Sequence, residues 1–270
     1  MLTLPMVAEK YLAERHCSHH YVACLRRVAG RCRELSTERI NAYLRARLEM
    51  VSASTVRFER TMILSLVKFA WERDILTVPI KGVMRVKSRR PPTRAWTIPQ
   101  VQAAIAGCEV YESRKLRTGA PMGAFLRAWI LIGYETGSRY GDIWGFSAGH
   151  LVEDTLRWTQ SKTGDPIVKV LSPACRAAVD QMLALSPDGR IIGWACQRRQ
   201  AMRTMKAHLK SCGLDGTSKW LRRSGATHCE IERPGSGRLH LGHRSVGIFE
   251  QAYADWGQIR ANAPVTPRIA

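Results

Sequence analysis

The sequence predicts a mainly α-helical protein with an all-α domain at residues 1–76 and a mixed α+β domain at residues 98–270 that contains a small antiparallel sheet. Three observations predict this architecture. Apolar residues recur at helical spacing through the first domain, a proline-rich basic stretch interrupts the pattern at residues 77–97, and residues 151–171 alternate as in a β-hairpin. With 270 residues, 45% apolar and 24% charged, the chain has the composition of a folded globular protein, which excludes disorder.

The first domain is predicted to contain four helices. The first occupies residues 5–15, and each of the next three follows a hydroxyl residue that can cap its N-terminus. The predicted caps are Ser18, then Ser36 or Thr37, then Ser52 or Ser54. Arginines fill much of the space between the apolar positions, so each helix is expected to pack one face and present cations on another.

The stretch at residues 77–97 is predicted to be a linker between the domains. Its prolines prevent helix formation and keep the chain extended. Its basic residues suit a segment that follows a phosphate backbone, although a plain solvated spacer is an alternative.

The second domain is predicted to open with a helix near Ile98 or Pro99, because proline is favoured in the first turn. A mostly apolar helix should follow at about residues 120–135. Arg139 comes just after this helix ends, and we expect Asp142, three residues later, to hold its guanidinium group.

The alternating segment that follows predicts a hairpin with Lys162 at or beside its tip. Two further helices are expected, from Pro173 through Leu185 and from Arg198 to Lys210.

The chain is strongly basic, with 42 Lys and Arg against 22 Asp and Glu and a formal net charge of +20. Such a charge implies an anionic partner, and nucleic acid is the leading candidate, with an anionic membrane surface second. Arginine outnumbers lysine, which suits forked contacts to phosphate oxygens. The candidate DNA-binding residues in the first domain and linker are Arg26, Arg27, Arg57, Arg89, Arg90 and Arg94.

The eight cysteines form no Cys-x-x-Cys pair and no secretion signal precedes them, which favours a reducing cytoplasm. Cys17, Cys24 and Cys32 lie near three histidines and suggest zinc. Their spacing of seven and eight residues is more simply that of one helix face, so no metal is predicted. No apolar run reaches the roughly 18 residues that cross a bilayer, so no membrane span is predicted.

Reactive side chains gather near the C-terminus, in the segments Leu221-Arg-x-x-x-Ala-Thr-His228, Leu241-Gly-His243 and Phe249-Glu-Gln-Ala-Tyr253. Two earlier segments, Glu135-Thr-Gly-Ser-Arg139-Tyr-Gly-Asp142 and Ser161-Lys-Thr-Gly164, precede them in order. Together these segments resemble the catalytic domain of the tyrosine recombinase (phage integrase) family.

The resemblance implies a core-binding, SAM-like domain ahead of the catalytic domain, and residues 35–44 and 52–57 resemble that domain more loosely. It also implies a homo-tetramer that acts on two double-stranded DNA duplexes through a Holliday junction, with an accessory DNA-bending protein as a further partner. An additional N-terminal arm-site domain is not expected.

Cleavage of a phosphodiester needs cations at the nonbridging oxygens, a nucleophile, and a proton for the leaving oxygen. Arg139 and Arg222 are the candidates for the oxygens, and His243 can donate a further hydrogen bond. The resemblance makes Lys162 the general acid for the 5′ oxygen. Tyr253, the last tyrosine, would be the nucleophile that forms a 3′-phosphotyrosyl link, so religation needs no ATP, metal or cofactor.

The sequence departs from the family pattern at two points. Lys219 stands where a histidine usually precedes the second arginine, and it could contact phosphate or accept a proton. The interval from His243 to Tyr253 is ten residues, one more than expected. The tail at residues 256–270 is predicted to be extended, because it contains prolines, and by resemblance would dock on a neighbouring subunit.

Two other functions are open. One is the same chemistry in a type IB topoisomerase-like, telomere-resolving or resolvase role. The other is a DNA-binding protein that kept the fold and lost catalysis, which the two departures would favour.

Overall fold

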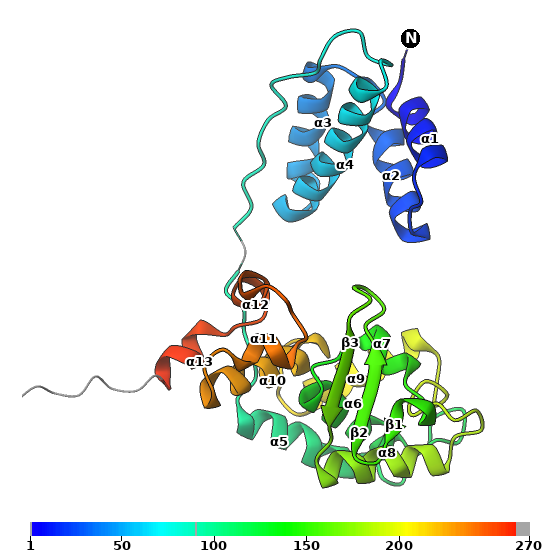
Figure 1. Cartoon of the computed structure of the whole chain (residues 1–270), viewed down its shortest axis with the longest axis vertical. Coiled ribbons are helices and arrows are strands. Elements are labelled where there is room, and N and C mark those ends of the chain that lie inside the picture. Colours follow the sequence, from blue (N-terminus) through cyan, green and yellow to red (C-terminus); the bar gives the residue numbers. More distant parts are fainter. Residues whose placement is uncertain (1, 90, 263–270) are drawn as a thin grey trace, which may run out of the picture. The chain divides into compact units, whose positions relative to one another are not determined.

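The computed structural model describes residues 2–89 and 91–262 and divides into two compact units, residues 1–91 (unit 1) and 92–270 (unit 2) (Figure 1). Each unit has its own hydrophobic core. No helix within the described ranges combines the length and the apolar character that crossing a membrane requires.

Unit 1 is all α, as predicted. Its helices within residues 2–89 are α1 (Leu4–Glu14), α2 (His19–Arg31), α3 (Thr37–Met50) and α4 (Ala53–Glu72). Ser18, Ser36 and Ser52 each accept a hydrogen bond from the backbone N–H three residues later, which satisfies a donor that a helix start leaves free. These caps explain where α2, α3 and α4 begin.

Part of the predicted linker packs on unit 1. Ile80, Val83, Met84 and Val86 pack against its core. The Asn41 side chain bridges to this segment, since its Nδ2 donates to the Gly82 carbonyl (3.1 Å) and its Oδ1 accepts from the Met84 N–H (2.8 Å). The extended backbone therefore has partners on α3, while Trp96 further along is buried in unit 2.

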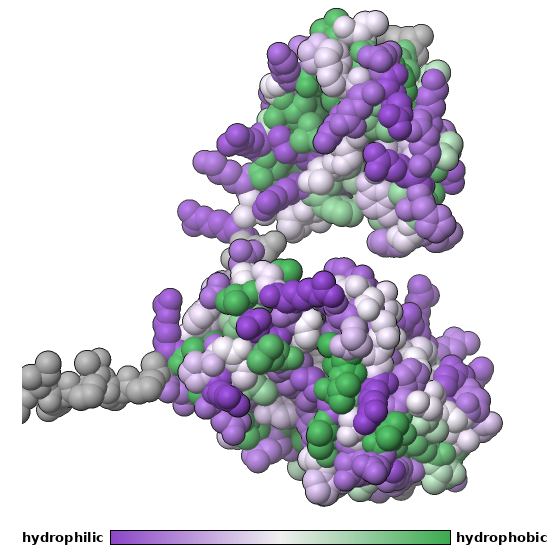
Figure 2. Space-filling model, viewed as in Figure 1, coloured by the Kyte–Doolittle hydropathy of each residue, from purple (hydrophilic) through white to green (hydrophobic). Residues whose placement is uncertain are grey.

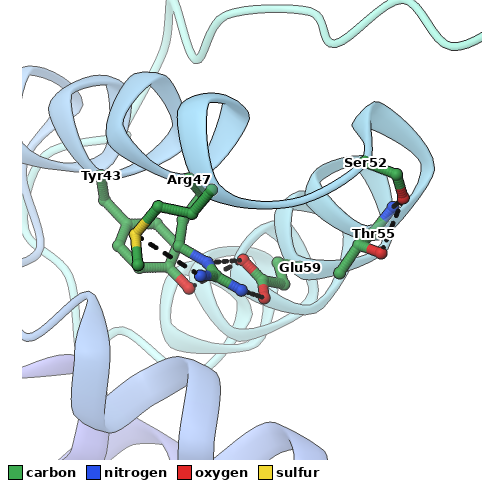
Figure 3. Close-up of polar contacts among 6 residues, drawn as sticks. Tyr43, Arg47, Ser52, Thr55 and Glu59 are labelled. Carbon is green, nitrogen blue, oxygen red and sulfur yellow. Dashed lines mark hydrogen bonds and ion pairs between the residues drawn. The ribbon is translucent and has the colours of Figure 1, made fainter.

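A buried ion pair joins α3 to α4 (Figure 3). Arg47 donates from Nε and Nη2 to the two carboxylate oxygens of Glu59 (2.9 and 2.8 Å), and the Tyr43 hydroxyl donates to Oε2 (2.9 Å). The Arg47 and Glu59 side chains are only 12% and 7% exposed. Burial alone would raise the pKa of Glu59, but the hydrogen bonds from Arg47 and Tyr43 outweigh it and lower that pKa.

We expect Glu59→Leu to lower the local unfolding free energy of unit 1 by about 3–5 kcal/mol, because it leaves the Arg47 guanidinium buried without its acceptor. Native-state hydrogen exchange of α3 and α4 amides in the full chain measures this. Glu14→Leu is the matched control, since Glu14 pairs with Arg73 at 43% and 53% exposure and should cost about 1 kcal/mol or less. Equal losses in the two variants would contradict the assigned role of Glu59.

Unit 2 is mainly helical. Its helices in the described ranges are α5 (Ile98–Ala106), α6 (Met122–Glu135), α7 (Tyr140–Gly145), α8 (Pro173–Ala184), α9 (Arg198–Ser211), α10 (Lys219–Glu232), α11 (Ser236–His240), α12 (Val246–Ala252) and α13 (Trp256–Ala261), with 3-10 turns η1 (Gly107–Tyr111) and η2 (Ala148–His150). A capping box between Thr97 and Gln100 starts α5, and Pro99 lies in its first turn, as predicted.

The sheet of unit 2 is a three-stranded antiparallel meander in the order β1 (Leu151–Val152), β2 (Thr155–Thr159), β3 (Pro166–Val170). In its register Arg157 pairs with Val168 and Thr159 pairs with Pro166, which leaves Lys162 in the turn between β2 and β3. The predicted hairpin is therefore confirmed.

Helix α6 is the centre of the unit 2 core. Its residues from Gly123 to Gly133 are almost all buried, and α8 and α10 pack against it. Two glycines allow α10 to approach closely. A Cβ on Gly133 would meet the Leu221 side chain, and one on Gly225 would clash with the Tyr134 carbonyl. This packing places the start of α10 beside the end of α6.

The prediction of an extended tail was wrong for its first part. Asp255 accepts hydrogen bonds from the Gly257 and Gln258 N–H groups and caps α13, so local capping starts a helix ahead of the prolines. Residues 263–270 lie outside the described residues.

Candidate active site

Arg222 is the buried cation at the centre of the site. It lies in the first turn of α10 and is 3% exposed. Its guanidinium donates to the Gly137 carbonyl, the Leu241 carbonyl (3.2 Å) and His243 Nε2 (3.0 Å). Burial lowers the pKa of Arg222, and these acceptors compensate the buried charge.

Arg139 approaches from the junction of α6 and α7. Its Nη1 donates to Gln160 Oε1 (2.6 Å), and within the described residues no hydrogen bond or ion pair joins it to Asp142. The prediction that Asp142 holds Arg139 was wrong. Arg139 is the N-cap of α7 with extended backbone (φ −71°, ψ 147°), so the helical three-residue spacing does not apply to it. Asp142 Oδ1 instead accepts from the Ser161 N–H (3.1 Å) and hydroxyl (2.6 Å).

Lys162 lies on the exposed turn of the β2–β3 hairpin. The turn closes on Gln160, whose N–H donates to the Asp165 carbonyl (2.9 Å) and whose carbonyl accepts from the Gly164 N–H (2.8 Å). Among the residues that the structure describes, Lys162 makes no hydrogen bond to the other candidate catalytic residues. The fold thus positions the base of the hairpin and leaves the lysine side chain in solvent.

The Tyr253 ring is surrounded by three other candidate residues. It lies edge-on to the His243 ring at 5.0 Å between centroids, with Arg222 Cζ 5.1 Å and Lys219 Nζ 6.0 Å from its own centroid. Tyr253 is the C-cap of the short helix α12, which Phe249 anchors through its buried side chain. Although Tyr253 follows His243 by ten residues, one more than expected, its phenol therefore lies beside Arg222 and Lys219.

The surrounding charges set the ionisation of the site. Burial raises the pKa of the Tyr253 phenol, but the charges of Arg222, Lys219 and Arg139 outweigh it, and the pKa lies below its ordinary value. Burial, followed by the charges of Arg222 and Arg139, lowers the pKa of His243 to about 4. The imidazole is then neutral near pH 7 and accepts at Nε2, because arginine can only donate.

The predicted DNA-binding arginines are not equivalent. Arg26 forms a forked pair with Glu9, with both hydrogen bonds at 2.8 Å, so its charge is locally offset. Arg90 lies outside the described residues. The other four, Arg27, Arg57, Arg89 and Arg94, are exposed. None of them has an ion-pair partner in the described part of the chain. Figure 2 shows hydrophilic side chains over much of the visible face of unit 1.

Gln160 is a residue of the site that the sequence motifs did not single out. It is 2% exposed and touches both Arg139 and the Leu241 carbonyl. The alternation of buried and exposed side chains in β2 could have indicated it. Leu156 and Trp158 are buried, and Gln160 is the next residue on the same, inward side.

Three of the solved structures that share this fold are integrases bound to DNA. The whole chain aligns with a lambda integrase dimer bound to a COC′ core site, at a TM-score of 0.77 and 19% identity, covering 81% of that chain. It aligns over its whole length with a lambda integrase tetramer bound to a Holliday junction, at a TM-score of 0.76 and 18% identity, covering 80% of that chain. The Tn1549 transposon integrase in complex with circular intermediate DNA aligns over 97% of this chain and 99% of its own, at a TM-score of 0.67 and 14% identity.

A scan against protein-family models and a search of curated protein sequences gave no match. The structural likeness, at these identities, establishes the fold. The chain shares the fold of these integrase structures and consists of an all-α unit followed by a mainly helical unit with a small antiparallel sheet, so the predicted fold class is confirmed.

Proposed function

We propose that this protein is a tyrosine-type site-specific DNA recombinase, or integrase, that cleaves and rejoins DNA strands through a 3′-phosphotyrosyl intermediate. One observation supports this most. The Tyr253 ring lies against His243, Arg222 and Lys219, in a chain with the fold of DNA integrases. A phenol with a lowered pKa among cations is suited to attack an anionic phosphate.

In the proposed reaction, the Tyr253 phenol loses its proton to solvent, and the phenolate Oη attacks the phosphorus of the scissile phosphodiester. The bond from phosphorus to the tyrosine oxygen forms, the bond to the 5′ oxygen breaks, and Lys162 protonates that oxygen as it leaves. The products are a 3′-phosphotyrosyl link and a free 5′ hydroxyl. The reverse attack by the 5′ hydroxyl of another strand restores the phosphodiester, so the bond is conserved without ATP.

Arg139 and Arg222 are proposed to bind the nonbridging oxygens of that phosphate. Arg222 Cζ lies 5.1 Å from the Tyr253 ring centroid, and hydrogen bonds through Gln160 and the Leu241 carbonyl connect Arg139 to Arg222. Arginine remains charged at any relevant pH and presents a planar fork that matches two oxygens. Charge that builds on the phosphate in the transition state is thereby stabilised.

Lys219 is proposed to take the place of the family's histidine. It begins α10, one turn before Arg222, and its ammonium group lies near the Tyr253 ring. A cation at this position can favour the phenolate before attack and contact the phosphate afterwards.

The proposed substrate is duplex DNA bound by both units, as a homo-tetramer on two duplexes. A lambda integrase of the same fold is a tetramer on a Holliday junction. Arg27, Arg57, Arg89 and Arg94 are the proposed phosphate contacts of unit 1 and the linker, because they are exposed and unpaired within the described ranges. An accessory DNA-bending protein is a further proposed partner.

The test uses a library of nicked duplexes with a randomised core, in which cleavage beside the nick releases a short fragment and traps the enzyme. We expect a covalent protein–DNA adduct that survives denaturation, and sequencing of the attached strand identifies the site. DNA binding without any adduct would favour a protein that only binds DNA. Relaxation of supercoiled DNA without strand exchange would favour the topoisomerase-like alternative.

A further inference from the structure

The side chain of Gln160 connects three segments of the site. Its Oε1 accepts from Arg139 Nη1 (2.6 Å) and from Thr163 Oγ1 (3.0 Å), and its Nε2 donates to the Leu241 carbonyl (3.1 Å). Arg139 follows α6, Thr163 belongs to the hairpin turn, and Leu241 follows α11. One buried amide therefore bonds to segments that are up to about a hundred residues apart in the chain.

The Leu241 carbonyl continues this network to the second arginine. It accepts from Gln160 Nε2 (3.1 Å) and from Arg222 Nη2 (3.2 Å), and Arg222 Nη2 also donates to His243. Gly242 makes the approach possible. It has φ +65°, and a Cβ there would lie 3.0 Å from Gln160 Nε2 and overlap Ile167. Hydrogen bonds thus run without a gap from Arg139 through Gln160 and Leu241 to Arg222.

We propose that Gln160 is a positioning residue that aligns the Arg139 and Arg222 guanidinium groups on one phosphate and ties the Lys162 hairpin to them. That the two arginines bind a phosphate rests on the proposed function, whereas their alignment by Gln160 rests on the hydrogen bonds alone.

An amide suits this place better than a carboxylate. Its oxygen faces the Arg139 donor and its nitrogen faces the Leu241 acceptor, so only one orientation satisfies both ends. A glutamate would also orient Arg139, but it would offset the charge of Arg139 and set an oxygen against the Leu241 carbonyl. A neutral partner holds the guanidinium and leaves its full charge for an anion.

The experiment compares Gln160→Met, which keeps the length of the side chain and removes its hydrogen bonds, with Gln160→Glu. We expect each to slow single-turnover adduct formation by about 100-fold, the effect of a misplaced catalytic group, with little change in DNA affinity. Asn41→Leu is the matched control, because Asn41 is also a bridging amide but lies in unit 1. Its rate in the saturated complex should stay within about two-fold of the parent.

Two measurements identify the mode of action. The Gln160→Met change should slow adduct formation much less in an Arg139→Lys background than in the parent, because both substitutions act through the same guanidinium. Independent, additive slowing by the two substitutions would overturn the proposal.

Arginine side-chain NMR of the free protein is the second measurement. With Arg139 assigned from the spectrum of Arg139→Lys, its Nη groups should rotate faster in Gln160→Met than in the parent. Unchanged Nη signals would also overturn it. If the parent forms no adduct but the Nη signals change, the alignment by Gln160 stands and the proposed function fails.

Discussion

Tyr253→Phe should abolish covalent adduct formation, because a phenylalanine side chain has no oxygen that can bond to phosphorus. The substitution removes only the hydroxyl. The phenylalanine ring can still pack edge-on to His243 and under the Arg222 guanidinium, so the fold and the affinity for DNA should be kept. Denaturing gel electrophoresis of the trapped adduct, beside a binding measurement on the same nicked duplex, measures both quantities.

Tyr111→Phe is the control for this prediction. Tyr111→Phe likewise removes only a hydroxyl, one that is hydrogen-bonded to Ser211 Oγ (3.2 Å), and Tyr111 lies in η1 and outside the site. Its adduct yield should match that of the parent. An adduct formed by Tyr253→Phe at the parent rate would show that another residue is the nucleophile.

Arg222→Lys should slow adduct formation by about 10³-fold, the upper range for loss of one preorganised transition-state donor. The charge is kept, but an ammonium group cannot reproduce the planar fork that donates to the Gly137 and Leu241 carbonyls and to His243. We also expect a loss of about 1–3 kcal/mol in stability for a buried carbonyl left without a donor. Single-turnover cleavage and thermal unfolding separate the two effects.

Arg127→Lys is the matched control. Arg127 is also partly buried in unit 2, at 24% exposure, and its guanidinium pairs with Glu112 (2.7 Å) away from the site. Cleavage should remain close to that of the parent. If both arginine variants slowed cleavage equally, the loss would reflect general destabilisation and not a role of Arg222 at the phosphate.

The local structure could be predicted closely where its cause lies in neighbouring residues. Ser18, Ser36 and Ser52 cap helices because a hydroxyl three residues before a free N–H can accept from it. The β2–β3 hairpin with Lys162 in its turn follows from alternation and turn residues in the same way. By contrast, α10 and α13 were not predicted, because α10 depends on packing against α6 and α13 on the Asp255 cap just ahead of a proline-containing tail.

The candidate site was predicted as a set of residue types but not as a set of contacts. Arg139, Arg222, His243 and Tyr253 could be named from their motifs. The motifs paired Arg139 with Asp142, whereas the fold pairs it with Gln160, which is 21 residues away. The lowered pKa of Tyr253 also depends on Lys219 and Arg222, which precede it by tens of residues.

The sequence by itself determined most of the helical and strand segments, though not α10 or α13, together with their order, the basic character and the identity of the reactive side chains. Each of these depends on residues within one or two turns of the chain, where spacing alone decides which side chains share a face. Only the tertiary structure decided which acceptors hold the guanidinium groups, that the phenol meets them despite the long interval after His243, and that Gln160 links them. Those contacts join α6, the hairpin, α10 and the segment after α11, and their geometry follows from how closely the glycines let these elements pack.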